Sequence, residues 1–433
     1  MSAMDEPDVP TAQLRILSSL DDIAPEKWDR VANPGWTLGP KGVLGRDPAV
    51  APLESLCEQN ESQHEELPFN PFLSHAFLSS LEETGCATRN TGWAPRHMIL
   101  EAEDGAIWGA VPAYLKSHSQ GEYVFDYGWA DAFYRAGGDY YPKLQISVPF
   151  TPATGRRFLI APDINREAGL QALASGLVEV CSRSGASSVH ATFLTKPEWD
   201  DLGEIGYLQR TDQQFHWDNR GYATFDDFLA DLASRKRKAI KKERRAALEN
   251  SGIEIEWVTG DDLTEAHWDA FYRFYQDTGA RKWGRPYLNR SFFSVVSEKL
   301  AHQTLLVMAK RNGKYIAGAL NFIGSNTLFG RNWGCTEHHP FLHFEVCYYQ
   351  AIDFAIARGL HRVEAGAQGA HKLARGYMPT TTYSAHWIAH PGLRDAVADF
   401  LEQERRAVER ENAVLAEHAP FKKTATGGAA ESD

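Results

Sequence analysis

Hydrophobic and polar residues along this chain form two similar series of strand-like and helix-like segments. Apolar residues recur at helical spacing in LQALASGLVEVCSRSG (170–185) and EVCYYQAIDFAIARG (345–359), and both segments end at glycine, the residue favoured just after a helix. Strand-like runs come before each helix (MILEAEDG, YVFDYGW, TLLVMAKRNG, IAGALNFIG), and a short one follows it (SVHATFL, RVEAGA). This order predicts an α/β (α+β) fold with mixed sheets and helices on their faces.

The two series share a frame of Gly-Tyr, eight residues and His-Trp, in GYLQRTDQQFHW (206–217) and GYMPTTTYSAHW (376–387). Three further pairs of segments occur in the same order, namely 20–29 with 260–269, 105–129 with 313–333, and 185–193 with 359–367. We infer a duplicated domain of roughly 170–200 residues, a size that one core supports. A superposition is expected to match Gly109 with Gly318, Trp129 with Trp333, and Trp217 with Trp387.

The frame predicts how the chain is organised. The expected parts are an N-terminal domain at 13–218, with an inserted loop at about 36–67, a basic linking helix at 219–250, and a C-terminal domain at 251–418. The polar ends 1–12 and 419–433 are expected to be disordered tails. The segment 393–417 is predicted to be an amphipathic helix with Val397, Phe400, Leu401, Val408 and Leu415 on one face.

Composition places the chain among ordinary globular proteins. Hydrophobic residues make up 43% and charged residues 24% of the sequence, and the net charge of −12 argues against a general nucleic-acid coat. Charges interrupt every apolar stretch, so no transmembrane segment is expected, and the acidic start has no secretory signal. Because the five cysteines form no CxxC pair, they are interpreted as free thiols of a cytoplasmic protein.

The linking segment TFDDFLADLASRKRKAIKKERRAAL has a character of its own. Thr224 and Asp227 have the spacing of a helix-capping box. Between Arg235 and Arg245 every residue is basic except Ala239, Ile240 and Glu243. Such a cationic stretch is either a solvated surface helix or a contact for phosphate or nucleic acid. The candidate phosphate-binding residues are Arg235, Arg237 and Lys241.

These residues carry a resemblance to known families. The duplicated mixed unit resembles a pair of GNAT-type acyltransferase folds. SRKRKAIKKERRAALENSGIEI is similar to the K-x-R-x-x-I pattern of the Fem ligases, which add amino acids to peptidoglycan precursors, with Arg235 at the lysine position. VEAGAQGAHKLARGY resembles the Fem loop that ends in Phe-Lys and then Gly, with Lys372 at the lysine position and Gly376 at the glycine position. His371 stands in place of the phenylalanine and Leu373 follows the lysine.

A closer resemblance runs from about 70 to 404. The phrases NPFLSHAFLSSLE, GWADAFYRAGGDYYPKLQ, VPFTPATG, TGARKWGRPYL and AGAQGAHKLARGY identify the chain as similar to the FemAB-like group of predicted N-acyltransferases, described as peptidoglycan biosynthesis or recognition proteins. An acid is expected in that group where this chain has Ala370. The resemblance implies two tandem GNAT-like domains.

Acyl transfer to an amine needs a base, a group that polarises the carbonyl, and a place for the leaving group. Glu364 lies in the short strand RVEA before a glycine-rich loop, so it is the candidate base or substrate anchor, with an ion pair to Arg362 or Arg375 as the structural alternative. Lys372 and His371 follow the loop as further catalytic candidates. The first unit has His190 where the second has Glu364, so only the second unit is expected to be catalytic.

Candidate substrate-binding residues lie in aromatic and cationic segments. The loop DTGARKWGRPYL suits an anionic ligand, and FDYGWADAFYRAGGDYYPKL suits a cleft wall, although a surface loop and a packed strand end fit them equally. The candidates are Asp126, Trp129, Arg281, Trp283, Arg285, Arg331, Trp333, Glu345, Gln368 and Tyr383. The histidines near Glu337 are not interpreted as a metal site, and none is predicted.

These observations favour an N-acyltransferase that moves an acyl group from an acyl thioester, such as acyl-CoA, to an amine. The usual R-x-x-G-x-G/A loop for coenzyme A is missing, and GCTEHHPFLHFEV stands in its place, with Pro340 at the expected start of a helix. Two alternatives stay open. One is Fem-like transfer from aminoacyl-tRNA to a cell-wall precursor, and the other is non-catalytic binding of peptidoglycan fragments.

Overall fold

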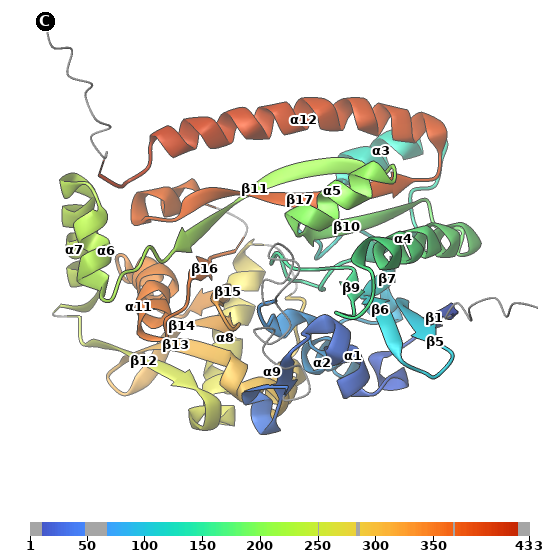
Figure 1. Ribbon diagram of the computed structural model, residues 1–433. Helices are drawn as coiled ribbons and strands as arrows, with labels where there is room; N and C mark the ends of the chain where they lie inside the picture. Colours follow the sequence, from blue (N-terminus) through green and yellow to red (C-terminus); the bar gives the residue numbers. More distant parts are fainter. Residues whose placement is uncertain (1–10, 48–66, 250, 283–285, 367–368, 423–433) are drawn as a thin grey trace, which may run out of the picture.

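The largest sheet of the molecule contains strands from both halves of the chain. Two long strands, β11 (Leu208–Asp218) and β17 (Met378–Ile388), lie antiparallel beside each other within it. β17 also pairs with β10 (Ser188–Leu194) of the first half, and β11 also pairs with β16 (Arg362–Glu364) of the second half. Each half therefore places its last long strand against the sheet of the other half (Figure 1).

The computed structural model describes residues 11–47, 67–249, 251–282, 286–366 and 369–422. Its mixed sheets, flanked by helices, are those of the predicted α/β class. The predicted division at 13–218 and 251–418 stays a prediction about how the chain divides, and the exchanged strands join those two parts in one sheet.

The first half builds a four-stranded sheet, β1-β5-β6-β9, and one end of the eleven-stranded sheet, β10-β8-β7-β4, which β17 of the second half joins to the rest. Its remaining elements are β1 (Ala12–Leu17), α1 (Pro25–Ala32), β2 (Trp36–Leu38), β3 (Leu44–Arg46), α2 (His75–Glu83), β4 (Trp93–Pro95), β5 (His97–Ala102), β6 (Ile107–Val111), β7 (Ala113–Lys116), α3 (Tyr127–Arg135), β8 (Lys143–Ile146), β9 (Leu159–Ile160), α4 (Arg166–Arg183) and α5 (Lys196–Glu204).

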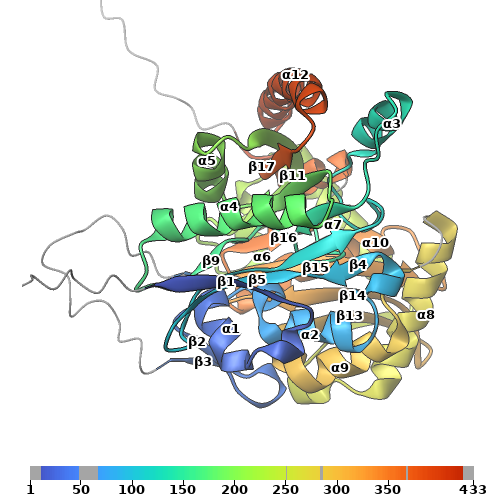
Figure 2. The ribbon, with the colours of Figure 1, turned by 90° about the vertical axis from the view of Figure 1, so that its right-hand side faces the viewer.

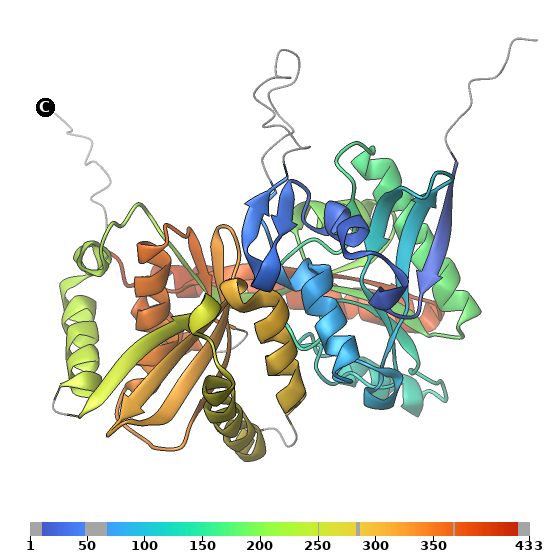
Figure 3. The same ribbon diagram turned by 90° about the horizontal axis from the view of Figure 1, so that it is seen from below.

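The second half builds the other end of the large sheet, β12-β13-β14-β15-β16. Figure 3 shows the two halves as neighbouring lobes. The elements of this half are α6 (Phe225–Asp231), α7 (Ser234–Leu248), β12 (Ile253–Thr259), α8 (Glu265–Lys282), α9 (Arg290–Leu300), β13 (Thr304–Arg311), β14 (Lys314–Ile323), β15 (Thr327–Cys335), α10 (Leu342–Phe344), a π-helical turn (Glu345–Tyr349), α11 (Gln350–Ala357), a 3₁₀ helix (Ala370–Arg375) and α12 (Pro391–Glu417).

The two lobes share a core. The ring of Phe72 in the first half lies 5.2 Å from that of Phe322 and 5.1 Å from that of Phe329 in the second, with edge-on geometry in both pairs. One buried cluster contains residues of both halves, whereas two others belong mainly to one lobe each. Because aromatic residues bury large areas, this contact fixes the lobes against each other.

The long helix α12 lies over β11 and β17 (Figure 2). Leu393, Val397 and Leu401 are buried beneath it, as the amphipathic pattern predicts. The prediction is wrong for Phe400, which is 47% exposed. Thr224 and Asp227 form the predicted capping box at the start of α6.

Other local predictions are wrong. YVFDYGW was expected to be a strand, but α3 begins at Tyr127, and the ring of Trp129 packs edge-on against His386 at 5.0 Å. Trp129 is therefore helical whereas Trp333 lies in β15, so that matched pair fails. Gly109 and Gly318 do lie in the middle strands β6 and β14. Tertiary packing overrides the strand-like pattern here.

Two expected loops or tails contain structure. The start of the predicted loop 36–67 forms the hairpin β2–β3, and residues 48–66 lie outside the described part. At the predicted tail, Phe421 bridges to Leu232, and the Arg220 guanidinium lies 3.8 Å from the centre of its ring. The C-terminal end of the described chain therefore packs against the region of α6.

Candidate functional site

The end of β16 carries the most unusual carboxyl group of the second lobe. β15 and β16 run parallel and pair only from Thr327 to Phe329 and from Arg362 to Glu364, after which β15 continues to Cys335. Val363 packs into the core of the second lobe, and alternation along the strand turns Glu364 to the other face. Glu364 is 6% exposed.

Glu364 is buried without a lysine or arginine at ion-pair distance within the part of the chain that the structure describes. Its carboxylate accepts a backbone hydrogen bond from Thr154 of the first lobe, while Oε2 is buried with no hydrogen-bond partner among the described residues. Burial raises the pKa of Glu364 to about 7, although Arg362, that hydrogen bond, Arg331 and Arg157 act in the opposite direction.

The arginines near Glu364 have other partners. The Arg157 guanidinium donates to the backbone oxygens of Thr192 at 3.0 Å, Gly155 at 3.1 Å and Ala153 at 2.7 Å. Arg362 binds Asp218 at 2.7 Å. Because these guanidinium groups are held elsewhere, Glu364 keeps a pKa at which it can gain and lose a proton near neutral pH.

Strand exchange supplies the neighbour of Glu364. His216 on β11 lies opposite it in the sheet, with Nε2 4.0 Å from Oε2 of Glu364 and 3.1 Å from Oε1 of Gln214. Burial lowers the pKa of His216 to about 3, so its imidazole is neutral at physiological pH. The base candidate therefore faces a neutral polar side chain from the other lobe.

Lys372 lies in the 3₁₀ helix that follows the glycine-rich loop. Its ammonium donates to the backbone oxygen of Gly366 at 2.9 Å, and burial lowers its pKa to about 8. No direct contact joins Glu364 and Lys372 among the described residues. His371 Nε2 lies 2.9 Å from the Tyr348 hydroxyl at the surface. That these residues act together stays a prediction.

A small pocket of about 20 Å³ lies between the lobes, and Glu364 is not among the residues that line it. Tyr123, Phe150, Tyr275 and Tyr287 form aromatic walls, and Arg331 of β15 contributes the only basic side chain among the lining residues. The remaining lining residues are Phe77, Leu81, Pro149, Thr151, Leu288, Phe292, Phe322 and Asn332. The Arg331 guanidinium donates to the backbone oxygen of Phe150. The pocket thus joins segments of both lobes around one cation.

A second, wider cavity of about 370 Å³ lies along the basic helix α7. Arg235, Lys236 and Arg375 line it, together with Ala239, Ile240, Glu243 and Ala374. Lys241 instead pairs with Asp226 at 3.2 Å on the surface. Arg235 is therefore the predicted phosphate-binding residue that the structure places at a cavity, and Arg237 is not among its lining residues.

Acidic residues of the second lobe hold α7 in place. Glu345, predicted to bind substrate, is fully buried and accepts from Arg244 at 2.8 and 3.1 Å. Arg375 binds Glu243 at 2.9 Å and covers the Phe344 ring at 3.5 Å. Glu345 is therefore held by Arg244, and Arg375 is held by Glu243. Arg375 does not form the alternative ion pair with Glu364.

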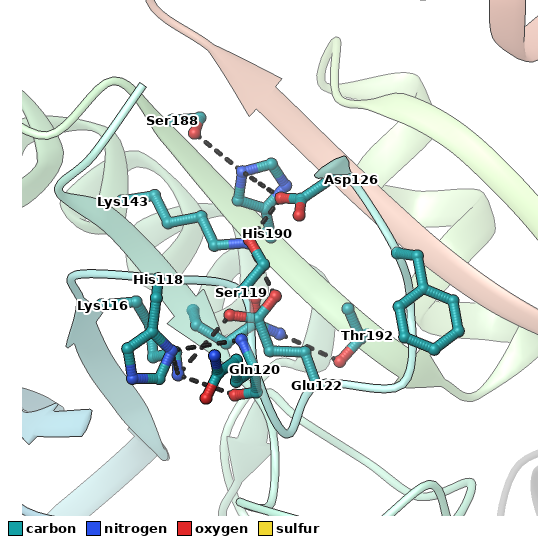
Figure 4. A network of polar contacts seen from close by, with 12 residues as sticks. Lys116, His118, Ser119, Gln120, Glu122, Asp126, Lys143, Ser188, His190 and Thr192 are labelled. Atoms are coloured by element: carbon teal, nitrogen blue, oxygen red, sulfur yellow. Dashed lines mark hydrogen bonds and ion pairs between the residues drawn. The ribbon is translucent and has the colours of Figure 1, made fainter. Parts of the chain in front are cut away.

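The first lobe contains a buried network of opposite charges at the matching position (Figure 4). Lys143 binds Glu122 at 2.6 Å and Asp126 at 2.5 Å, and the Tyr140 hydroxyl donates to Asp126 at 2.7 Å. His190 Nδ1 lies 2.7 Å from His386 Nδ1 on the exchanged strand β17. Asp126 and Trp129, predicted as substrate contacts, thus belong to this network and its covering helix.

The remaining predicted residues lie apart from Glu364 or outside the description. The Trp333 ring packs 5.2 Å from that of His343, and the Tyr383 ring packs 5.2 Å from that of Trp199 on α5. Trp283, Arg285, Gln368 and the side chain of Arg281 lie outside the described residues. Pro340 does not open a helix, because α10 begins at Leu342 after Phe341, whose φ is 63°.

Sequence reasoning missed residues that only the fold brings to Glu364. His216 belongs to the repeated His-Trp frame, and that repetition is the sequence signal for paired positions in the two lobes. Phe150 lies in the phrase VPFTPATG and Tyr123 in the run YVFDYGW, but neither was given a role, and Arg157 is separated from Glu364 by about half of the chain. Lys143 and Asp126 both lie in the aromatic segment, but neither their ion pair nor that of Lys143 with Glu122 was predicted.

The described residues provide no group of three or more His, Cys, Asp or Glu side chains arranged to hold a metal. Glu337 instead pairs with Arg311 at 3.0 Å and with His339 at 2.9 Å. Within the same ranges, no helix combines the length and apolar character needed to cross a membrane.

Comparison with known proteins gave one family. The model described as FemAB-like, peptidoglycan biosynthesis/recognition, matches residues 19–423. Search of curated proteins gave no match. Among solved structures, FemX is 12% identical, with 75% of this chain and 93% of that chain covered and a TM-score of 0.47. A tandem GNAT protein from the clavulanic acid biosynthesis pathway is 11% identical, with 88% and 99% covered and a TM-score of 0.41. N-myristoyltransferase of Saccharomyces cerevisiae, solved with myristoyl-CoA, is 10% identical, with 89% and 80% covered and a TM-score of 0.43.

Proposed function

This chain belongs to the FemAB-like family of peptidoglycan biosynthesis/recognition proteins, and we propose that it is an N-acyltransferase with Glu364 as general base. The acyl group comes from an acyl thioester such as acyl-CoA and is transferred to an amine. The observation that supports this most is the buried Glu364 carboxyl, with one unpartnered oxygen and a pKa raised to about 7. A base with a pKa near the working pH is effective in proton transfer.

In the proposed reaction, the amine nitrogen attacks the acyl carbonyl carbon and forms the new C–N bond. The ionised Glu364 takes the proton that the nitrogen loses, and the C–S bond breaks as the thiolate leaves. The thiolate then takes up a proton, from Glu364 or from solvent. Lys372 is assigned to polarise the carbonyl, since its amino group lies just past the loop that leaves β16.

The position of the donor's phosphates distinguishes the two donor classes. The segment after β15 lacks the usual R-x-x-G-x-G/A loop for a pyrophosphate, and Arg311 of β13 is already paired with Glu337 of that segment. The cavity along α7 has Arg235, Lys236 and Arg375 on its wall, so it fits donor phosphates better. This basic surface also favours the second candidate function, in which an aminoacyl-tRNA supplies the acyl group and a cell-wall precursor supplies the amine.

The donor and acceptor are identified by mass spectrometry of small molecules that co-purify with the protein, followed by turnover assays with acetyl-CoA and with alanyl-tRNA. Glu364→Gln keeps the shape and removes the base, so turnover is expected to fall about a hundredfold or more. Glu83→Gln is the matched control, because it makes the same chemical change on α2, away from β16. Glu83 pairs there with Lys299 of α9 at 2.7 Å.

Normal turnover by Glu364→Gln contradicts the assignment of the base. Consumption of alanyl-tRNA but not acetyl-CoA selects the second candidate. Binding of peptidoglycan fragments with no consumption of either donor contradicts both and makes the protein a binding module.

A further inference from the structure

The N-terminal end of the basic helix α7 concentrates positive charge. The helix begins at Ser234 after Ala233, which provides no side-chain cap, and its first turn contains no acid. Arg235 and Lys236 occupy that turn instead. Cations there add to the partial positive charge of a helix N-terminus, whose first N–H groups have no acceptor within the helix. Such an end is favourable only when an anion lies beside it.

Other cations of α7 show what this end lacks. Farther along the helix, Lys241 pairs with Asp226 at 3.2 Å, and Arg245 has an acid of the same helix at 3.4 Å. Arg235 and Lys236 have no acid at ion-pair distance among the described residues. Their charges are therefore available to a ligand.

The cavity of about 370 Å³ lies against this end of α7. Its volume falls within the range of about 300–1,000 Å³ that is typical of small-molecule sites. Arg235 and Lys236 line it from α7, and Arg375 lines it from the 3₁₀ helix. The apolar lining residues are Ala239, Ile240 and Ala374. The cavity thus has room for a ligand and cations on two sides.

Arg375 supplies a donor that the protein leaves unused. It is 7% exposed, and its guanidinium donates to the backbone oxygen of His371 at 2.7 Å and to Glu243 at 2.9 Å. Its Nε is buried without a hydrogen-bond partner in the described chain, and a buried donor of this kind indicates a missing acceptor. Glu243, the one carboxylate among the lining residues, is neutralised by Arg375 and by the Tyr349 hydroxyl.

The charge of the cavity wall selects a compact, doubly charged anion. Of its three cationic groups, only Arg375 has an acidic partner, so two charges and the helix end face the cavity. A phosphate monoester carries nearly two charges and a diphosphate at least as many, with several oxygens that accept charge-assisted hydrogen bonds. A phosphate of a nucleic-acid backbone carries a single charge, and a run of them follows a groove rather than a cavity.

We propose that this cavity binds a phosphate monoester or diphosphate group, held by Arg235, Lys236 and the first N–H groups of α7. Arg375 lies one turn of the 3₁₀ helix after Lys372, the group assigned to the acyl carbonyl. The bound group is therefore the phosphate end of the acyl donor. Its assignment to the donor rests on the proposed function, whereas the binding of the anion does not.

Isothermal titration calorimetry of the full-length protein tests the proposal, with inorganic diphosphate, inorganic phosphate and dimethyl phosphate as probes at constant ionic strength. Dimethyl phosphate carries the single charge of a nucleic-acid phosphate. The tighter of the first two probes is expected to bind at least about tenfold more tightly than dimethyl phosphate, because the second charge strengthens the hydrogen bonds from the cations. A preference for diphosphate identifies a diphosphate group, and a preference for phosphate identifies a monoester.

The double variant Arg235→Gln and Lys236→Gln is expected to weaken binding of the tighter probe at least about tenfold. Lys238→Gln with Lys242→Gln is the matched control, because it removes the same charge from the same helix at positions that do not line the cavity. The control is expected to weaken binding less than about threefold, since solvent and salt screen these more distant charges. Equal losses in the two double variants overturn the proposal, as does equal binding of the three probes to the wild type.

Glu364→Gln is expected to keep binding of the tighter probe while losing turnover, so the anion site and the base are tested separately. Absence of binding to the wild type overturns the anion site and leaves the assignment of the base intact. The tighter probe is also expected to inhibit turnover in competition with the acyl donor. Inhibition that is not competitive overturns the assignment of the cavity to the donor.

Discussion

The two lobes have matching positions where an exchanged strand meets the last short strand of the other lobe, and the two positions have opposite chemistry. In the first lobe, His190 of β10 lies opposite His386 of β17. In the second lobe, Glu364 of β16 lies opposite His216 of β11. The repeated His-Trp frame of the sequence thus supplies one histidine to each position.

Charge balance separates the two positions. In the first, burial alone would raise the pKa of Asp126, but the Lys143 ammonium, with smaller contributions from His190 and a hydrogen bond from Ser119, holds it well below its usual range. In the second, burial of Glu364 prevails and raises its pKa to about 7. Asp126 therefore stays charged, whereas Glu364 can gain and lose a proton near neutral pH. Glu122 of the first network also has a pKa raised to about 7, so the contrast is between Asp126, which Lys143 keeps charged, and Glu364, which has no lysine or arginine at ion-pair distance among the described residues.

The largest expected effect breaks the charge balance of the first lobe. Lys143→Met leaves Glu122 and Asp126 buried without their shared cation, so the free energy of unfolding is expected to fall by about 3–5 kcal/mol. Urea denaturation measures this change. The control Lys310→Met removes a partly exposed partner of Glu256 and is expected to cost less than about 1 kcal/mol. Equal effects of the two substitutions would contradict the special role of the buried network.

Glu364 is expected to behave in the opposite way. Its folded pKa of about 7 lies above the ordinary 4.5, so between these values the unfolded chain releases a proton that the folded chain keeps, and stability falls as pH rises. Glu364→Gln lacks this penalty, so relative to wild type it is expected to gain as much as about 3 kcal/mol between pH 4.5 and 8.

Urea denaturation of both proteins at pH 4.5 and pH 8 measures this difference. The pKa values of Asp29 and Glu122 are also raised to about 7. Both proteins contain these residues, so their contributions to the pH dependence of stability cancel in the comparison. A parallel pH dependence of wild type and variant would show that Glu364 does not titrate with a raised pKa.

The same shift predicts the pH dependence of activity. A general base must be ionised, so kcat/KM is expected to rise about tenfold per pH unit up to about pH 7. If Lys372 acts as a cation, the rate falls again above about pH 8, where it loses its proton. A pH profile with an acidic limb near 4.5 would assign the chemistry to an ordinary exposed carboxyl group instead.

The smallest structural effect is expected on α7. The triple substitution Arg235→Gln, Arg237→Gln and Lys241→Gln is expected to leave stability nearly unchanged, because Arg235 and Lys241 are exposed and Arg237 is partly exposed. If they contact tRNA phosphates, the slope of log affinity against log salt falls by about one unit for each lost contact. Fluorescence anisotropy with labelled tRNA measures this slope. An unchanged slope would make α7 a solvated surface helix.

The sequence predicted elements whose cause is local. The Thr224–Asp227 capping box depends on neighbouring backbone groups, and the helices before Gly185 and Gly359 depend on periodicity and on a glycine stop. The α/β fold with mixed sheets and the FemAB-like family were also predicted from the residues and are confirmed. The strand predicted at YVFDYGW is wrong, because contacts with His386 and α12 decide the conformation of Trp129.

What the sequence by itself determined is therefore the α/β class with mixed sheets, those elements whose cause is local, and the presence of Glu364 at the end of a strand. Only the tertiary structure decided that β11 and β17 exchange places, that His216 faces Glu364, and that Arg331 meets Tyr123 and Phe150 in one pocket. Alternation along a strand indicates which face a residue occupies, but not which strand lies beside it. Because the charge of a buried group depends on those neighbours, the proton-accepting character of Glu364 and the neutralised state of the first lobe follow from the fold.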